Sequence, residues 1–284
     1  MGKENFYKAD GVDIDAGDAF SKYAGELARQ TYKYSNFVEV FDLARGNFRG
    51  PRGFLFKDLP RGYIITGGMD GIGTKVVIID AAGNFQDAAS NLLAMTAMDI
   101  TRYGGLPLIF LNIFDVRSLG EVGSERFKVC KQIMWGLWKE AANNRFVIFN
   151  GETAELGLCV GSENPSAKVM FNWGGCMLGI YHPQKMILGD TLRPGQIIIA
   201  LADDFRSNGI SSARKALAIK YGAEWWNNPK AVSDILAAAS PSVIYDRMLN
   251  AAHGWFSGFE SDFKPLIKMH LIVHLSGGAF KSKL

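Results

Sequence analysis

The sequence predicts an α/β or α+β fold, because apolar runs of strand length alternate with segments of helix length. With 284 residues the chain is longer than most single domains, so we expect two domains. Turn residues at Gly189 and Pro194 mark the junction. We therefore expect an N-terminal domain at residues 1–182 and a C-terminal domain at residues 183–284.

The N-terminal domain has the clearer pattern of elements. Residues 63–79 are typical of two β-branched strands around a glycine loop. A helix should follow, because Leu92, Met95 and Asp99 recur at helical spacing on one stripe. The predicted order after the first two strands is a helix at 86–103, a strand at 107–114, a helix at 121–142, a strand at 146–149 and a strand at 170–181.

The C-terminal domain should open with a strand at residues 197–201 and end with a strand at residues 271–275. Three helices are predicted between them, at residues 211–221, 232–239 and 243–252. The last strand leads into a glycine loop close to the end of the chain, which predicts an incomplete domain.

Composition excludes several classes of protein. Lys and Arg number 31 against 28 Asp and Glu, and they are dispersed, which argues against a nucleic-acid partner. Three cysteines without CxxC spacing predict neither a disulfide framework nor a zinc site. No 18-residue apolar run and no signal-like N-terminus are present, so we expect a cytoplasmic protein without a membrane partner.

The glycine loop at residues 67–75 is the first candidate site. Glycines let main-chain amides approach an anion, Lys75 could neutralise phosphate charge, and Asp70 could hold Mg²⁺ between phosphates. The loop lacks the Walker A pattern, so a hairpin turn with a chance lysine is the alternative.

Three polar residues lie on or beside the predicted helix at 86–103. Asn91 and Asp99 are eight residues apart and fall on roughly the same side, where oxygen ligands would suit Mg²⁺. Asp99 could instead have a partner inside the core. Asp87 could simply favour the positive end of the helix dipole.

Two further motifs adjoin predicted elements. Glu152 follows an apolar strand, at the strand end where α/β sheets often bind ligands; a solvated loop carboxylate is the alternative. Ser207, Asn208 and Gly209 precede a helix, where they would bind phosphate or cap the helix. No Ser/His/Asp or Cys/His constellation can be assembled.

Six motifs, in this order, carry a family resemblance. They are YKADGVDIDAG at residues 7–17, DGIGTK at 70–75, LLAMTAMDI at 92–100, GETAE at 151–155, SNGISSARK at 207–215 and HLSGG at 274–278. Together they resemble the phosphoribosylformylglycinamidine cyclo-ligase family of purine biosynthesis, over nearly the whole chain.

The resemblance implies a PurM-like fold. In that fold an N-terminal mixed sheet forms an intersubunit barrel in a homodimer, next to a C-terminal α/β domain, which would be incomplete here. The implied substrates are ATP, with Mg²⁺, and formylglycinamidine ribonucleotide. The implied reaction phosphorylates the formyl oxygen and then closes the imidazole ring by attack of an amidine nitrogen.

The resemblance also implies residue roles. The implied catalytic residues are Lys75, Glu152 and Asp70, and the implied metal residues are Asp70, Asp99 and Asp87, the last from more distant relatives of the fold. The implied nucleotide-binding residues are Gly71, Gly73, Thr74, Lys75, Asn91, Ser207, Asn208, Gly209, Gly277 and Gly278.

Some positions depart from the family pattern. Asn91 stands where the family usually has an aspartate, Met98 where it has an asparagine, and Arg206 where a histidine often precedes SNG. Family members also continue well beyond HLSGG. The alternatives are therefore an inactive or fragmentary nucleotide-binding paralogue, or another ATP-using enzyme of the same fold.

Overall fold

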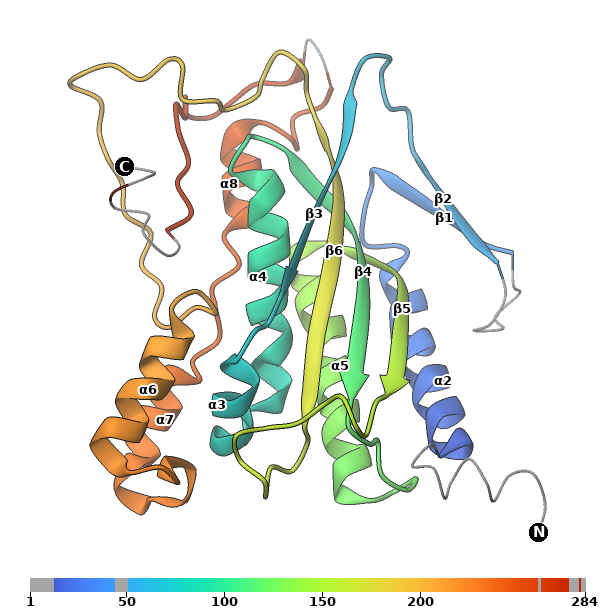
Figure 1. Ribbon diagram of the computed structural model, residues 1–284. Coiled ribbons are helices and arrows are strands. Elements are labelled where there is room, and N and C mark those ends of the chain that lie inside the picture. The colour runs from blue at the N-terminus through green and yellow to red at the C-terminus, as the bar shows by residue number, and fades with distance from the viewer. Residues whose placement is uncertain (1–12, 44–50, 260–261, 276–280, 282–284) are drawn as a thin grey trace.

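The computed structural model describes residues 13–43, 51–259, 262–275 and 281 (Figure 1). At its centre lies a four-stranded mixed sheet in the order β3-β6-β4-β5. The strands are β3 (Ile64–Gly71), β4 (Leu106–Val116), β5 (Val147–Glu155) and β6 (Phe171–Tyr181). Strand β6 runs antiparallel to β3 and β4, whereas β4 and β5 are parallel. The mixed sheet with helices agrees with the predicted fold class.

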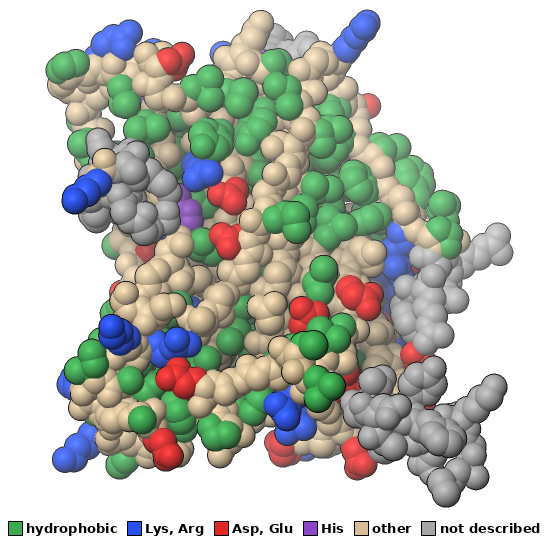
Figure 2. Space-filling model, viewed as in Figure 1, with side chains coloured by type: hydrophobic (Ala, Val, Ile, Leu, Met, Phe, Trp, Pro, Cys, Tyr) green, Lys and Arg blue, Asp and Glu red, His purple; other side chains and the backbone are tan. Residues whose placement is uncertain are grey.

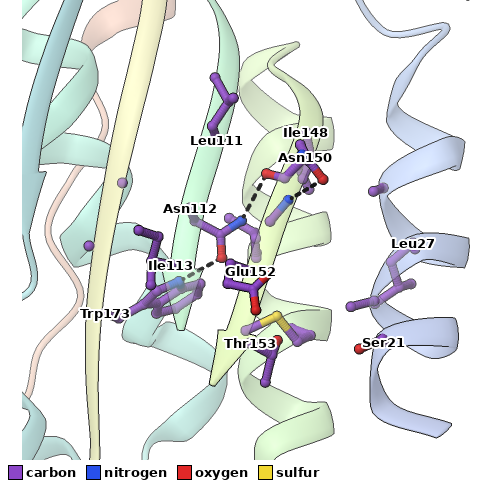
Figure 3. Close-up of a pocket in the computed structure, with 18 of the residues that line it drawn as sticks. Ser21, Leu27, Leu111, Asn112, Ile113, Ile148, Asn150, Glu152, Thr153 and Trp173 are labelled. Atoms are coloured by element: carbon purple, nitrogen blue, oxygen red, sulfur yellow. Dashed lines mark hydrogen bonds between the residues drawn. The ribbon is translucent and has the colours of Figure 1, made fainter. Parts of the chain in front are cut away.

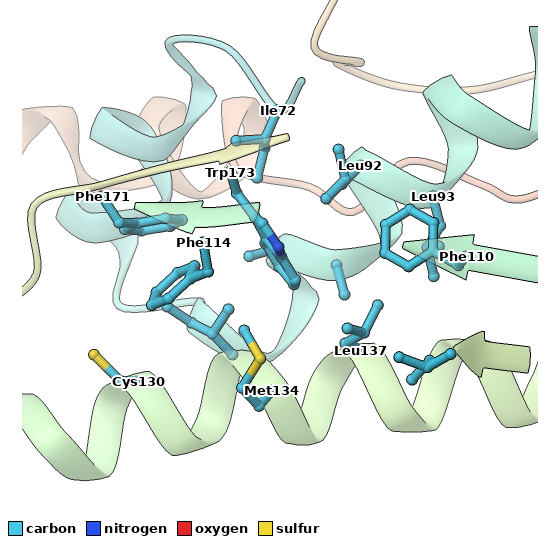
Figure 4. Packing of buried hydrophobic residues seen from close by; sticks show 14 of the residues in the cluster. Ile72, Leu92, Leu93, Phe110, Phe114, Cys130, Met134, Leu137, Phe171 and Trp173 are labelled. Carbon is cyan, nitrogen blue, oxygen red and sulfur yellow. The ribbon is translucent and has the colours of Figure 1, made fainter. Parts of the chain in front are cut away.

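Two helices, α4 (Ala88–Thr101) and α5 (Glu125–Asn144), cover one face of the sheet, and α2 (Ile14–Thr31) lies beside α5 and β5 (Figure 1). Between them is a buried core of aromatic and aliphatic side chains (Figure 4). Phe114 and Trp173 meet edge to face, with ring centroids 5.8 Å apart, and both are fully buried.

Local chemistry explains where α5 begins, ends and packs. The Ser124 hydroxyl caps its first turn by accepting a hydrogen bond from the Phe127 N–H at 3.2 Å. The helix ends at Arg145 in the left-handed conformation. Gly136 allows close packing, because a Cβ there would lie 1.9 Å from the Gln86 carbonyl oxygen of the 3₁₀ helix η1 (Phe85–Asp87).

The opposite face of the sheet is only partly covered. A hairpin of β1 (Val38–Asp42) and β2 (Arg52–Phe56) shares an apolar cluster with part of this face. The cluster also holds Trp255 and Phe263 from the C-terminal region, with ring centroids 5.1 Å apart. The rest of the face is open.

The second unit is built against α3 (Lys75–Ala82). Its other elements are α6 (Ile210–Tyr221), η2 (Trp225–Asn227), η3 (Pro229–Ala231), α7 (Val232–Ala238) and α8 (Asp246–His253). Val77 and Ile78 of α3 share a buried cluster with Leu217, Trp225 and Ile235. In the part of the chain that the structure describes, no helix has the length and apolar character needed to cross a bilayer.

Several predicted elements were wrong. The second strand of residues 63–79 is instead helix α3, because Gly73 turns the chain at a φ of +63° and the β-branched side chains then pack around a helix. Residues 197–201 and 271–275 form no strand. Ile197 and Ile198 are 88% and 89% exposed, so the predicted strand has no partner. The sequence reading missed α2, β1 and β2.

Candidate active site

A cavity of about 1090 Å³, here called the sheet pocket, lies between α2 and the strands of the central sheet (Figure 3). Ser21 and Leu27 reach it from α2, and Asn112, Glu152 and Thr153 reach it from β4 and β5 (Figure 3). Its charged lining residues are Asp13, Asp18, Arg52, Asp70, Glu152 and Glu155. Carboxylates therefore outnumber cations around this cavity.

The carboxylates of the pocket differ in how they are engaged. Glu155 accepts hydrogen bonds from the N–H groups of Leu119 at 2.7 Å and Asp13 at 3.1 Å, so it fastens the start of α2 to the sheet. Glu152 is exposed. Asp70 is half-buried and accepts a bond from the Gly71 N–H at 2.7 Å. Asp70 and Glu152 are the two predicted catalytic carboxylates that line the pocket, from β3 and β5 at opposite edges of the sheet.

Glu152 lies inside β5 rather than in a loop, since the strand continues to Glu155. It pairs with Ile113 in the parallel ladder. The sequence correctly associated it with the carboxyl-terminal half of a strand but placed the strand end too early. Its position on regular structure fixes the direction of its side chain better than a loop would.

Asn112 is a pocket residue that the sequence reading missed. It is 9% exposed; its Oδ1 accepts from Trp173 Nε1 at 3.0 Å, and its Nδ2 points to the Asn150 carbonyl at 3.5 Å (Figure 3). An asparagine inside the apolar run of residues 107–114 was the available signal, because a buried amide needs partners.

The loop after β3 carries three predicted nucleotide-binding residues. Gly71 closes the strand and lines the pocket. Gly73 turns the chain, and Thr74 then begins α3. The Thr74 and Ser211 hydroxyl oxygens are 3.1 Å apart, which joins this loop to the first turn of α6.

Lys75 lies outside the sheet pocket and is fully buried. Its ammonium donates to the main-chain carbonyl of Ser240 at 2.6 Å and to that of Phe205. Burial lowers the pKa of Lys75 to about 8, with Asp203 and Asp204 opposing that shift and Arg206 adding to it. The predicted phosphate lysine is therefore directed at main-chain oxygens in this structure.

Asn91 is also fully buried and faces the second unit. Its Oδ1 accepts from both the N–H of Ser242, at 3.2 Å, and the Ser242 hydroxyl, at 2.9 Å. Its Nδ2 donates to the Asp87 carbonyl at 3.0 Å. The amide thus fastens α4 to the connection between α7 and α8, which we call the α7–α8 connection (residues 239–245).

The predicted metal carboxylates lie at separate places. Asp99 pairs with Arg102 at 3.4 Å and packs against β3, where a Cβ on Gly68 would lie 2.8 Å from its Cβ. Asp87 precedes α4, and Asp70 lies at the sheet pocket. Over the described residues no group of three or more His, Cys, Asp or Glu is arranged to hold a metal ion.

The SNG motif lies at the start of α6. Gly209 has a φ of +77° and caps the helix without a side-chain hydrogen bond. Asn208 Nδ2 is 3.5 Å from the Met95 sulfur and 3.4 Å from His274 Nε2. Ser207 contributes a buried hydroxyl without a hydrogen-bond partner among the described atoms. Gly277 and Gly278 lie outside the described residues.

Arg206 binds several groups in this region. It pairs with Asp203, donates from Nη2 to the Val243 carbonyl at 2.8 Å, and lies 3.5 Å from His274 Nε2 through Nη1. The candidate residues therefore fall into two regions. The sheet pocket holds Asp70, Gly71 and Glu152, and the interface of α3 and α4 with the second unit, here called the junction, holds Thr74, Lys75, Asn91 and residues 206–209.

Several solved structures show a weak likeness to this chain. They include hydrogenase maturation protein HypE in complex with ATP, with a TM-score of 0.35, 17% identity, and coverage of 49% of this chain and 36% of that one. Thiamine-monophosphate kinase from Stenotrophomonas maltophilia K279a has a TM-score of 0.38, 11% identity and coverages of 69% and 52%. Likenesses at this level do not establish a shared fold or ligand.

Comparison with models of known protein families gave no match. Curated proteins named phosphoribosylformylglycinamidine cyclo-ligase do match. The relative from Pyrococcus furiosus is 25% identical over 275 residues, which is 96% of this chain and 72% of that protein. Those from Rippkaea orientalis and Myxococcus xanthus are 27% and 31% identical, covering 98% and 74% of this chain and 74% and 56% of theirs. The resemblance read from the six motifs is confirmed: over most of its length the chain is related to the phosphoribosylformylglycinamidine cyclo-ligases.

Proposed function

We propose that this protein catalyses ATP-dependent ring closure of formylglycinamidine ribonucleotide to 5-aminoimidazole ribonucleotide, with release of ADP and phosphate. The observation that carries the proposal is the similarity to cyclo-ligases along 96–98% of the chain. The geometry of the sheet pocket and the junction supports it, because together they offer the charges that this substrate pair requires.

The reaction needs positioning and charge neutralisation more than a protein nucleophile. The formyl oxygen of the substrate attacks the γ-phosphorus of ATP, and the bond to ADP breaks. An amidine nitrogen then attacks the activated formyl carbon, phosphate leaves with its bonding electrons, and a proton is lost from nitrogen. These reaction steps need no protein nucleophile, which agrees with an amino-acid sequence in which no catalytic triad was found.

The acidic sheet pocket suits the amidine end of the substrate. An amidine is a cation at neutral pH and presents two N–H groups in a fork, which carboxylates recognise well. Asp70 and Glu152 line the cavity, and Glu152 is exposed to it. We assign Glu152 as the base that takes the amidine proton, and Asp70, on the opposite edge strand β3, as a further negative charge of the pocket lining.

The junction suits the phosphates. Lys75, Arg206 and the start of α6, the positive end of its helix dipole, lie in one region. Only residues 72 and 73 separate this region from the pocket along the chain, because Gly71 lines the pocket and Thr74 belongs to the junction. Because Lys75 now donates to carbonyl oxygens, the proposal requires its ammonium to leave them when the triphosphate binds.

The three carboxylates predicted to hold Mg²⁺ lie apart in the structure. Asp87 and Asp99 do not join Asp70, and Asp99 is paired with Arg102, so the described residues do not fit a preformed magnesium site. No step is therefore routed through the metal. Of the three carboxylates, Asp70 is the one next to the glycine loop, in the last residues of β3, where it would contact a nucleotide-bound cation.

We also propose a homodimer, with the two domains divided at residues 182 and 183, in the cytoplasm. The open face of the central sheet carries exposed apolar side chains, among them Ile65 at 60%, together with Met69 at 76% and Ile113 at 52%, which also line the sheet pocket. Figure 2 shows hydrophobic side chains gathered over the strands on the face it displays. A second copy meeting this face, as in an intersubunit barrel, would remove that apolar surface from water.

The assay supplies formylglycinamidine ribonucleotide, ATP and Mg²⁺ and follows ADP together with the aminoimidazole product. We expect both to form, and Glu152→Gln to lower kcat by about 10²-fold or more. Glu125→Gln is the matched control, because Glu125 is exposed at the start of α5, away from the site. If Glu152→Gln formed the aminoimidazole product as fast as Glu125→Gln and the unchanged protein, Glu152 would be removed from the mechanism.

One observation favours a second candidate, a nucleotide-binding protein without turnover. Lys75 is held by two main-chain carbonyls and not by the pocket. Binding of a fluorescent ATP analogue with no product, under conditions where a cyclo-ligase from a relative is active, would favour this second function over the first.

A further inference from the structure

Two predicted ligand residues, Lys75 and Asn91, meet the same short stretch of the second unit. Lys75 donates to the Ser240 carbonyl at 2.6 Å, and Asn91 accepts two hydrogen bonds from Ser242. All three contacts end on the α7–α8 connection. Lys75 and Asn91 are fully buried, and Ser242 is 3% exposed.

The other carbonyl that holds Lys75 is fastened to the same connection. Phe205 belongs to the segment before α6, whose Asp203 carboxylate accepts from the Val243 N–H at 3.3 Å. Arg206 of the same segment donates to the Val243 carbonyl at 2.8 Å. The positions of the two carbonyl oxygens that contact the Lys75 ammonium, those of Phe205 and Ser240, therefore depend on the position of the α7–α8 connection.

Asn91 is the anchor of that connection on α4. Its Nδ2 bond to the Asp87 carbonyl orients the amide, so that Oδ1 faces Ser242. In the absence of Asn91, the Ser242 N–H and hydroxyl would be buried without an acceptor, which is costly. The connection would then move to recover hydrogen bonds, and the Ser240 carbonyl would move with it.

We propose that Asn91 is a positioning residue for Lys75, acting through Ser242 and the α7–α8 connection rather than by touching nucleotide or metal. Its role in phosphate chemistry rests on the proposed function, since that function is what assigns Lys75 to the triphosphate. The mechanical link from Asn91 to Lys75 does not depend on it.

The test measures the Lys75 amine directly, without substrate or turnover. Protein labelled with ¹³C-lysine is titrated by NMR, and the Lys75 signal is identified by its absence in Lys75→Arg. In the unchanged protein we expect a midpoint near the pKa of about 8, set by burial together with Asp203, Asp204 and Arg206. In Asn91→Ala the amine should gain access to water, and its midpoint should rise by about one pH unit or more, a tenfold change in proton affinity.

Asn144→Ala is the matched control. Asn144 donates its side-chain amide to the Glu140 carbonyl at 2.9 Å near the end of α5, so the substitution removes a comparable bond far from Lys75. We expect its Lys75 midpoint to equal that of the unchanged protein. If the loss of any asparagine side chain changed the Lys75 midpoint merely by destabilising the protein, Asn91→Ala and Asn144→Ala would give the same midpoint.

Ser242→Ala keeps the test informative if Asn91→Ala fails to fold. It removes the hydroxyl but keeps the main-chain N–H bond to Asn91, so a smaller rise in the Lys75 midpoint is expected. Combined with Asn91→Ala, it should add nothing further, since both act through one contact. An unchanged Lys75 midpoint in folded Asn91→Ala, or in folded Ser242→Ala where Asn91→Ala does not fold, overturns the proposal whatever the enzyme assay gives.

Discussion

The central sheet and the second unit solve the problem of burying apolar surface in different ways. The sheet closes its own core with α4 and α5, where Phe110, Phe114 and Trp173 are fully buried. The second unit takes part of its core from α3, which precedes it by more than a hundred residues. It also leaves Ile197 and Ile198 exposed. The second unit therefore depends on the first for stability, whereas every buried residue of the core between the sheet, α4 and α5 lies within residues 16–181. Trp255 and Phe263 of the C-terminal region pack only on the other face of the sheet.

Substitution of one buried tryptophan in each unit should give the largest difference between the two units. Trp173 in the sheet core and Trp225 in the second cluster are both fully buried. Trp173→Ala should lower the free energy of unfolding by about 3–5 kcal/mol, because it leaves a large cavity. Trp225→Ala should mainly release the amide protons of α6 and α7 in hydrogen exchange. Equal loss of protection in both units would contradict the asymmetry.

The next effect is a pH dependence at the junction. Burial lowers the pKa of Lys75 from 10.5 to about 8. Between about pH 8 and 10.5 the unfolded chain therefore binds more protons than the folded one. The free energy of unfolding should rise with pH across that window, by up to about 3 kcal/mol. Urea unfolding of Lys75→Met should lack this rise, and Lys128→Met, at an exposed site, should keep it.

Asp246 sharpens the comparison from the acidic side. It is fully buried in the first turn of α8, where neither carboxylate oxygen makes a complete hydrogen bond among the described atoms, and burial raises its pKa to about 6. Its contribution to stability is full below the unfolded pKa of 3.8 and is lost as pH rises through about 6. Asp246→Asn should therefore stabilise the protein above pH 6, by at most about 3 kcal/mol.

Asp80 of α3 is the matched control for that substitution. Burial also raises its pKa, but its Oδ1 accepts a hydrogen bond from the Val169 N–H at 3.1 Å. Asp80→Asn should give no comparable gain in urea unfolding, because it weakens a bond that the carboxylate makes. A similar gain in both variants would mean that burial alone, and not missing partners, sets the effect.

The smallest expected effect is the loss of stability on removing the helix cap at Ser124. Ser124→Ala removes the side-chain acceptor at the start of α5 and should cost about 1 kcal/mol in chemical unfolding. The start of α6 has no such cap, since Gly209 offers no side chain. A Ser124→Ala variant as stable as the parent would show that packing, not capping, holds α5 in place.

Much of the N-terminal fold could be read from sequence. The predicted strand at 107–114 lies within β4, and the predicted strand at 170–181 matches β6 within one residue. Long apolar strands and helices with regular apolar spacing carry their own signal. The segment at Lys75–Ala82 was wrongly predicted to be a strand, because its β-branched side chains favour a strand locally. In the folded protein it forms helix α3, whose side chains pack on both sides.

The amino-acid sequence by itself determined the family relationship and the alternation of strands and helices, and it singled out the carboxylates Asp70 and Glu152, which line the sheet pocket. Only the tertiary structure decided what Lys75 and Asn91 contact. Their partners Ser240 and Ser242 lie 165 and 151 residues away along the chain, so no local pattern encodes the pairing. Burial removed both side chains from water, and the polar groups that the fold placed opposite them became their hydrogen-bond partners.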